Sequence, residues 1–162
     1  MITGKPWPNV NIRSCLEKLR NHPFYAESVK KENIGSGFAL GIWPCNVSPA
    51  GANCRVLEDG TVQLFLGTSD ISGVHTGFAQ VVAEVLDVPL ETIEVVQQDT
   101  HSGPVAPVSG GSMVSYSVIG AIREASSEVR DRLLKLAANH FEANIQDLEL
   151  HQGKVRVTGV PS

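Results

Sequence analysis

The sequence predicts an α+β fold in which helices cover one face of a mixed sheet that is built from hairpins and single strands. Three observations predict it. Several short segments alternate apolar and polar residues between turn residues, two longer segments carry apolar residues at helical spacing, and the two kinds do not alternate strictly. With 162 residues, 42% of them hydrophobic, the chain can bury one ordinary core, so we expect a single domain over residues 1–162.

The N-terminal part is expected to hold two short helices and a strand. Residues 1–9 are proline-rich and aperiodic, which predicts an extended lead-in. Residues 10–31 have helical spacing that Pro23 interrupts, which predicts two helices rather than one. The alternation over residues 38–42 predicts a strand, and residues 44–52 predict an exposed connecting loop.

Two hairpins and one further strand are expected in the rest of the chain. Residues 54–66 alternate on either side of an Asp-Gly turn at Asp59, and residues 148–157 alternate on either side of a Gln-Gly turn at Gln152. Residues 93–96 predict a short strand between them.

Two apolar stripes predict two helices that face the core. Residues 78–86 carry the i, i+3, i+4, i+7, i+8 pattern, with Thr76 as the expected N-cap and Pro89 ending the segment. Residues 118–139 carry the longest and most regular stripe.

Two loops of small residues, 67–76 and 107–117, come directly before these helices. The first backbone N–H groups of a helix are unpaired and carry the positive end of its dipole, so such loops can hold a phosphate or the edge of a pterin. They could equally be simple turns. Neither contains GxxxxGK[ST] or GxGxxG, so a nucleoside triphosphate or a nicotinamide dinucleotide is not indicated.

Composition excludes several classes of partner. The net charge is −4 and no run of Lys or Arg is present, so nucleic acid is not an expected partner. No stretch approaches the roughly 20 apolar residues of a membrane span, and the N-terminus lacks the apolar core of a secretory signal. The three cysteines are too scattered for a disulfide framework or a zinc knuckle, which predicts a cytoplasmic protein.

A hydrolytic triad could be assembled from Asp70, Ser72, His75 and Ser112, but the signal is weak because the sequence around Ser112 lacks the second glycine of a nucleophile elbow. No histidine pair has the i, i+4 spacing of ligands on one helix face, so no metal site made of side chains is expected.

The order of these segments is similar to that in a known protein family. GTSDISGVHTGFAQVVAEVLDVPLETIEVVQQDT, followed by SGGSMVSYSVIGAIREA and a long helix, resembles the large-subunit family of molybdenum hydroxylases, which includes xanthine dehydrogenase, aldehyde oxidase and aerobic carbon monoxide dehydrogenase. The resemblance covers about residues 35–157 and implies one molybdopterin-binding domain, or a fragment, of a larger subunit.

The resemblance implies that both loops touch the molybdenum-molybdopterin cofactor, a pterin that carries a phosphate and often takes the cytosine dinucleotide form. The implied contacts are Asp70, Ile71, Ser72, Gly73, Gly110, Gly111, Ser112, Met113, Val114 and Ser115. Two of them depart from the family pattern, because Ser72 stands where many members have glutamine and Met113 where many have arginine.

The implied function is cofactor binding in an oxidoreductase that hydroxylates a carbon next to nitrogen or oxygen, with water as the oxygen source. The glutamate base of the family belongs to a part of the subunit that this sequence does not match, so no catalytic residue is assigned and the chain alone is expected to be inactive.

The implied partners are the remainder of the molybdenum-binding subunit and iron-sulfur and FAD subunits or domains. Apolar surface normally covered by these parts could lead to self-association. The alternative is a non-catalytic assembly module that keeps the fold without the cofactor. Purine, aldehyde and carbon monoxide are all open as substrates.

Overall fold

The structure is a computed structural model that describes residues 11–28, 32–35, 37–39, 41, 43 and 46–159. The chain divides into two compact units, residues 1–42 and residues 43–162, and each is described by itself. The expectation of one domain over residues 1–162 stays a prediction, and the lead-in expected for residues 1–9 lies outside the described residues.

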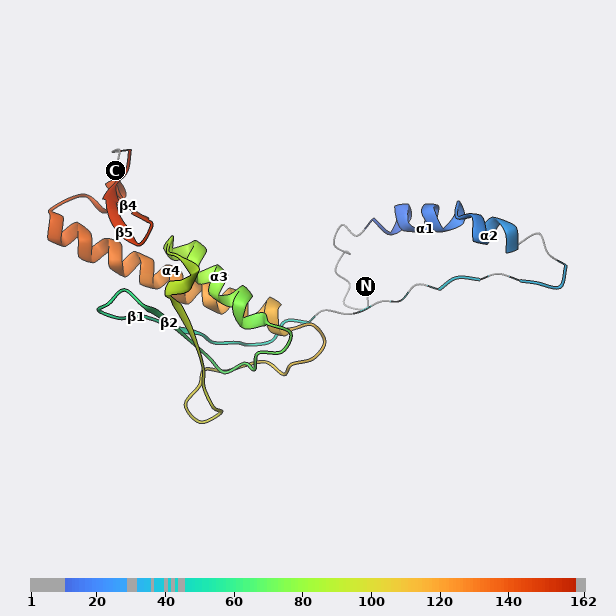
Figure 1. The fold of residues 1–162 in the computed structure, drawn as a ribbon, viewed down its shortest axis with the longest axis horizontal. Coiled ribbons are helices and arrows are strands. Elements are labelled where there is room, and N and C mark those ends of the chain that lie inside the picture. The colour runs from blue at the N-terminus through green and yellow to red at the C-terminus, as the bar shows by residue number, and fades with distance from the viewer. Residues whose placement is uncertain are drawn as a thin grey trace. The chain divides into compact units, whose positions relative to one another are not determined.

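The first unit contains two short helices, α1 (Ile12–Arg20) and α2 (Pro23–Ser28), as predicted (Figure 1). Pro23 opens α2, where the N–H that proline lacks would have no helical partner. The strand expected over residues 38–42 is wrong for the described residues of that range, which have no strand pairing. Phe38 instead meets the ring of Tyr25 edge-on, with centroids 6.3 Å apart. Alternation alone does not make a strand, because a strand needs a hydrogen-bonded neighbour.

The second unit is built on a three-stranded sheet. Strands β1 (Asn53–Val56), β2 (Val62–Leu66) and β3 (Ile93–Gln97) lie in that order, with β2 antiparallel to β1 and parallel to β3. The mixed sheet is therefore confirmed, and so is the β1–β2 hairpin. The 3₁₀ helix η1 (Leu90–Thr92) leads directly into β3.

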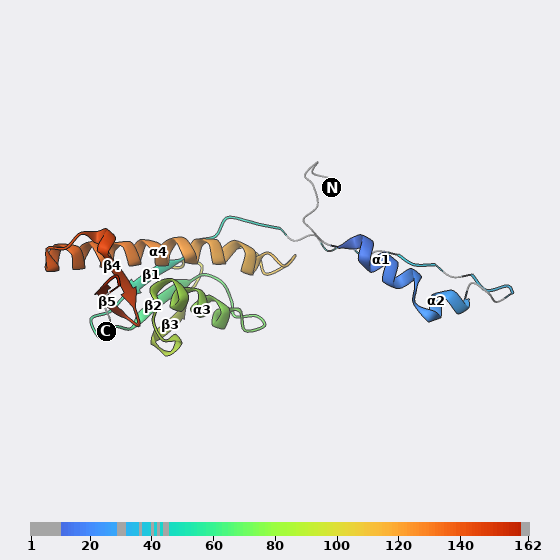
Figure 2. The same ribbon diagram turned by 90° about the horizontal axis from the view of Figure 1, so that it is seen from above.

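Helices α3 (Val74–Leu86) and α4 (Val114–Phe141) pack against each other and against one face of β2 (Figure 1, Figure 2). This confirms the predicted layers. Helix α3 also joins the parallel strands β2 and β3, so one βαβ unit is embedded in the α+β fold. The core combines the inward residues of β2 with the apolar stripes of both helices: Val62, Leu64, Leu66, Phe78, Val82, Leu86, Val118 and Ile122.

A second, two-stranded sheet follows the 3₁₀ helix η2 (Ile145–Asp147). It is the predicted hairpin of β4 (Leu148–His151) and β5 (Lys154–Val157), which turns through Gln152 and Gly153 at φ 49° and 73°. The turn is fastened to the end of α3, because the N–H of Gln152 donates to Asp87 Oδ2 at 3.0 Å and the N–H of Gly153 to the Asp87 carbonyl at 2.7 Å.

Candidate cofactor-binding site

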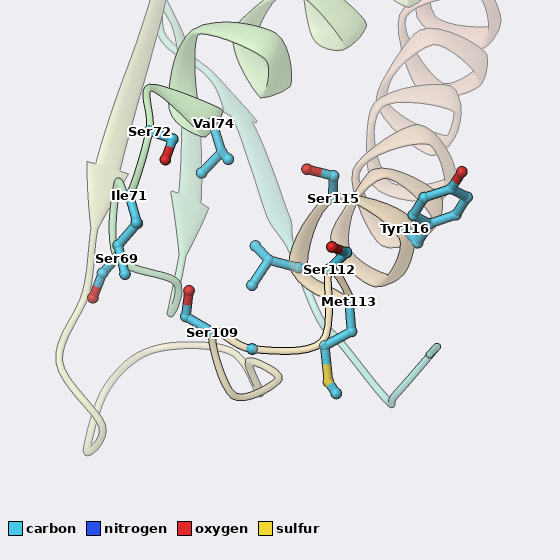
Figure 3. A pocket seen from close by; sticks show the side chains of 11 residues that line it. Ser69, Ile71, Ser72, Val74, Ser109, Ser112, Met113, Ser115 and Tyr116 are labelled. Atoms are coloured by element: carbon cyan, nitrogen blue, oxygen red, sulfur yellow. The ribbon is translucent and has the colours of Figure 1, made fainter. Parts of the chain in front are cut away.

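The two loops of small residues meet at one cavity of about 390 Å³. Figure 3 shows the hydroxyl groups of Ser72, Ser109 and Ser115 turned toward the space between the loops. The cavity is lined by Ser69, Ile71, Ser72 and Val74 from the first loop and the start of α3, and by Ser109, Gly110, Ser112, Met113, Val114, Ser115 and Tyr116 from the second loop and the start of α4. Two segments that are separate in the sequence thus form one site.

Seven of the ten predicted site residues line this cavity: Ile71, Ser72, Gly110, Ser112, Met113, Val114 and Ser115. Asp70, Gly73 and Gly111 lie in the same loops but do not line the cavity. Contact of any of the ten with a cofactor stays a prediction. Sequence reasoning missed four lining residues, each of which adjoins a predicted position: Ser69, Val74, Ser109 and Tyr116.

Both loops turn through two consecutive residues of positive φ shortly before their helix. The angles are 62° and 73° at Ser72 and Gly73, and 59° and 55° at Gly111 and Ser112. Serine adopts this conformation at a cost of about 1 kcal/mol, so the surrounding structure must hold it there. Both of these serines line the cavity, which makes the strained positions coincide with the candidate site.

The start of α3 is capped from within the first loop. Asp70 Oδ1 accepts the N–H of His75 at 3.1 Å, and His75 Nε2 lies 2.9 Å from the Thr68 carbonyl oxygen. Thr76, the expected N-cap, is wrong for that role: Gly73 occupies the N-cap, and the N–H of Thr76 donates to its carbonyl at 3.2 Å. The sequence did not predict this cap, because Asp70 lies five residues before His75, whereas a capping side chain usually accepts from an N–H two or three residues further on.

The second loop is shorter than expected, because α4 begins at Val114 and residues 114–117 form its first turn. Trp43 and Ser48 support this turn from outside. Trp43 Nε1 donates to Ser112 Oγ at 3.1 Å, and the N–H of Ser48 donates to Ser117 Oγ at 3.0 Å. The connecting loop expected to be exposed is therefore half-buried at Ser48, and sequence reasoning missed its role.

The electrostatic character of the cavity comes from backbone groups and hydroxyls. None of the described residues that line it carries a charged side chain, and the N-termini of α3 and α4 both adjoin it. The positive end of the α4 dipole acts on this space and favours an anionic ligand, whereas the Asp70 carboxylate offsets the positive end of α3.

The described residues do not assemble the alternative triad. The ring of His75 is bonded to the Thr68 carbonyl, and the Asp70 carboxylate accepts from the backbone N–H of His75 rather than from its ring. Among the described residues, no group of three or more His, Cys, Asp or Glu side chains is placed to hold a metal ion.

Comparison with known proteins decides the family. A family profile described as the molybdopterin cofactor-binding domain matches residues 13–162. The chain belongs to this family. It is 30% identical over 169 residues to the xanthine dehydrogenase molybdenum-binding subunit of Escherichia coli O157:H7, and the match covers 95% of the chain and 22% of that subunit.

A second relative is subunit gamma of the 6-hydroxypseudooxynicotine dehydrogenase complex of Paenarthrobacter nicotinovorans, at 36% identity over 106 residues, 65% of this chain and 13% of that subunit. The structure of reconstituted CO dehydrogenase from Oligotropha carboxidovorans superposes with a TM-score of 0.60 at 26% identity, over 68% of this chain and 14% of that one. The predicted family resemblance is confirmed, and the chain spans 22% or less of the length of these relatives.

Family membership supports a molybdenum cofactor as the class of ligand. The relatives are subunits of larger assemblies, which is consistent with further subunits as partners. No helix in the described part of the chain combines the length and the apolar character needed to cross a membrane.

Proposed function

We propose that this domain binds part of the molybdenum cofactor within the molybdenum-binding subunit of a hydroxylase-type oxidoreductase. One observation carries the proposal: two loops, each rich in glycine and serine and each leading into a helix, converge on one cavity. Family membership supports the ligand class, and the convergence of the two loops supports this cavity as its site.

The residues present fit an anionic, hydrogen-bonding group. The cavity of about 390 Å³ is within the size range of small-molecule sites, roughly 300–1,000 Å³. Its donors are serine hydroxyls and the N–H groups of the first turn of α4, and its lining contains no carboxylate that would repel a phosphate. Asp70 lies in the first loop, but its carboxylate oxygen is turned to the N–H of His75.

Each loop has a distinct task in this proposal. When bound, the molybdenum cofactor supplies the redox centre for hydroxylation of a carbon with water as the oxygen source. Ser72 and Ser115 would orient the ligand through their hydroxyls, and the first turn of α4 would bind its phosphate through backbone N–H groups. We assign no catalytic base to this chain, so it is expected to bind and position without turning over substrate alone.

The finer assignments belong to the same proposal. The cofactor would be of the molybdopterin type, with the cytosine dinucleotide form as one option. The partners would be the remainder of the subunit together with iron-sulfur and FAD subunits or domains. The free thiols of Cys15 and Cys54 support a reducing, cytoplasmic setting.

One observation favours the second candidate, an assembly module that binds no cofactor. Ser48 Oγ donates to Met113 Sδ at 3.5 Å, so Met113 packs against a neighbouring segment at the position where many family members have arginine. A site without that cation has one charge fewer for neutralising a phosphate.

Gly110 offers the test, because it lines the cavity and a Cβ built on it meets nothing within 4 Å. The chain would be produced together with the remainder of its subunit, and bound molybdenum and released nucleotide would be measured for the wild type, Gly110→Asp and Gly110→Asn. We expect the aspartate variant to lose at least about tenfold of both, because it sets a carboxylate against an anion, and the isosteric asparagine variant to lose much less. Equal retention by both variants, or no molybdenum in the wild type, would contradict cofactor binding and support the assembly module.

A further inference from the structure

We propose that His75 is a positioning residue, which holds the first loop in the shape that lines the cavity. The inference rests on the proposed function, since it concerns how the same site is kept ready for its ligand. It assigns a task to a side chain that does not itself line the cavity.

His75 is bonded to the loop at two points. Its ring Nε2 lies 2.9 Å from the Thr68 carbonyl oxygen, and its backbone N–H donates to Asp70 Oδ1 at 3.1 Å. A carbonyl oxygen can only accept, so Nε2 must carry a proton. The two attachments lie on either side of Ser69, and the cavity-lining Ile71 and Ser72 follow directly.

The ring is itself held in place by the core. Its centroid is 6.2 Å from that of Phe78, which lies one turn further along α3 and is 1% exposed. The other attachment point is also buried, because Thr68, two residues beyond the end of β2, is 5% exposed. His75 thus links two buried anchors, one on a helix and one beyond a strand, across the base of the loop.

This link explains how the loop retains its strained turn. Ser72 and Gly73 both have positive φ, which a serine rarely adopts. Such a conformation persists only when surrounding contacts determine it. The bonds of His75 and Asp70 are contacts of this kind, and they also aim the first N–H groups of α3.

If His75 positions the loop, loss of its bonds should change the cavity more than the packing of the sheet against the helices, because both bonds go to the loop. If His75 only filled space in the core, the size of its side chain would matter and the hydrogen bond would not. His75→Gln can keep an amide N–H near the position of Nε2, whereas His75→Leu fills similar space without any donor. The two variants therefore separate the hydrogen bond from the bulk of the side chain.

The experiment compares bound molybdenum at limiting cofactor supply in the wild type, His75→Gln and His75→Leu, each produced with the remainder of the subunit. We expect His75→Leu to hold about tenfold less molybdenum and His75→Gln to stay within about threefold of the wild type. Nitrogen-15 spectra of the wild-type ring should show the proton on Nε2. Circular dichroism should show all three proteins folded.

Two outcomes would overturn the inference: a folded His75→Leu variant with wild-type molybdenum, or a His75→Gln variant as depleted as His75→Leu. If His75→Leu does not fold, depletion in folded His75→Gln overturns the proposal, and retention together with the Nε2 proton supports it. Failure of the proposed function itself has another signature, which is retention of molybdenum by Gly110→Asp. If Gly110→Asp loses molybdenum and His75→Leu does not, only the positioning role is refuted.

Discussion

Replacing Gly67 by alanine should destabilise the second unit strongly, because no space exists for a side chain there. A Cβ on Gly67 would lie well inside van der Waals distance of the Pro104 carbonyl oxygen and 3.3 Å from the Cβ of Ala106. The obstacle is backbone, and it is held in place by the N–H of Gly51, which donates to the Val105 carbonyl at 2.7 Å. Residues 104–106 cannot move aside without breaking that bond.

The expected cost follows from this geometry. Overpacking a well-packed site costs about 1–3 kcal/mol, and a clash with tethered backbone belongs to the upper part of that range. For a chain of 162 residues each kcal/mol shifts the melting temperature by about 2–4 °C, so Gly67→Ala should lower it by about 4–12 °C. The φ of Gly67 is not positive, so backbone strain adds nothing.

Gly77 provides the matched control. It is exposed on α3 and a Cβ built there meets nothing within 4 Å. Alanine is favoured over glycine within a helix by about 1 kcal/mol, so Gly77→Ala should raise the melting temperature by about 2–4 °C. Differential scanning calorimetry of both variants checks the pair. A Gly67→Ala protein that melts within 2 °C of the wild type would refute the packing described for residues 104–106.

Three further predictions concern single side chains. Burial raises the pKa of the Cys54 thiol to about 11, so at pH 8 only about one part in 10³ of it is thiolate. Peptide mapping after iodoacetamide treatment should therefore show the exposed Cys15 alkylated well before Cys54. Equal rates of alkylation would contradict the burial of Cys54. The backbone N–H and then the hydroxyl of Ser102 hold the pKa of Asp99 below its ordinary value. These bonds therefore stabilise the folded loop above the unfolded pKa and are lost as pH falls through the folded pKa; a carboxyl titration followed by NMR should show the depressed midpoint, and an ordinary midpoint would argue against the turn. Asp87→Ala removes the side-chain acceptor, one of the two acceptors that fasten the β4–β5 turn, so the free energy of unfolding measured in urea should fall by about 1–2 kcal/mol, and amide exchange in the hairpin should accelerate.

Local pattern was sufficient for the elements whose stability is local. The stripes of α3 and α4 were predicted because their apolar residues face a single core, and both hairpins were predicted because a turn residue sits between two alternating runs. The failures have the opposite character. Residues 38–42 alternate in the sequence, yet their described members have no strand partner, and pairing is a property of the neighbour.

Helix starts were less predictable than helix interiors. Helix α4 begins at Val114 because Met113 takes the N-cap, although the apolar stripe becomes regular only from Val118. Helix α3 is capped through Asp70, whose carboxylate reaches His75 only after the loop has folded back. The small residues predicted both loops, but the residue at which each loop ends and its helix begins depends on tertiary contacts that the sequence pattern does not contain.

The sequence alone determined the helices, the hairpins and the presence of two glycine- and serine-rich loops before helices, because small residues and 3.6-residue or two-residue periods are written locally. Only the tertiary structure decided that these loops meet at one cavity, that His75 joins Thr68 to α3, and that Trp43 reaches Ser112, 69 residues away. The meeting of the two loops leaves no periodic trace in the sequence, since it arises when the parallel pairing of β2 with β3 places the loops that follow both strands at the same end of the sheet.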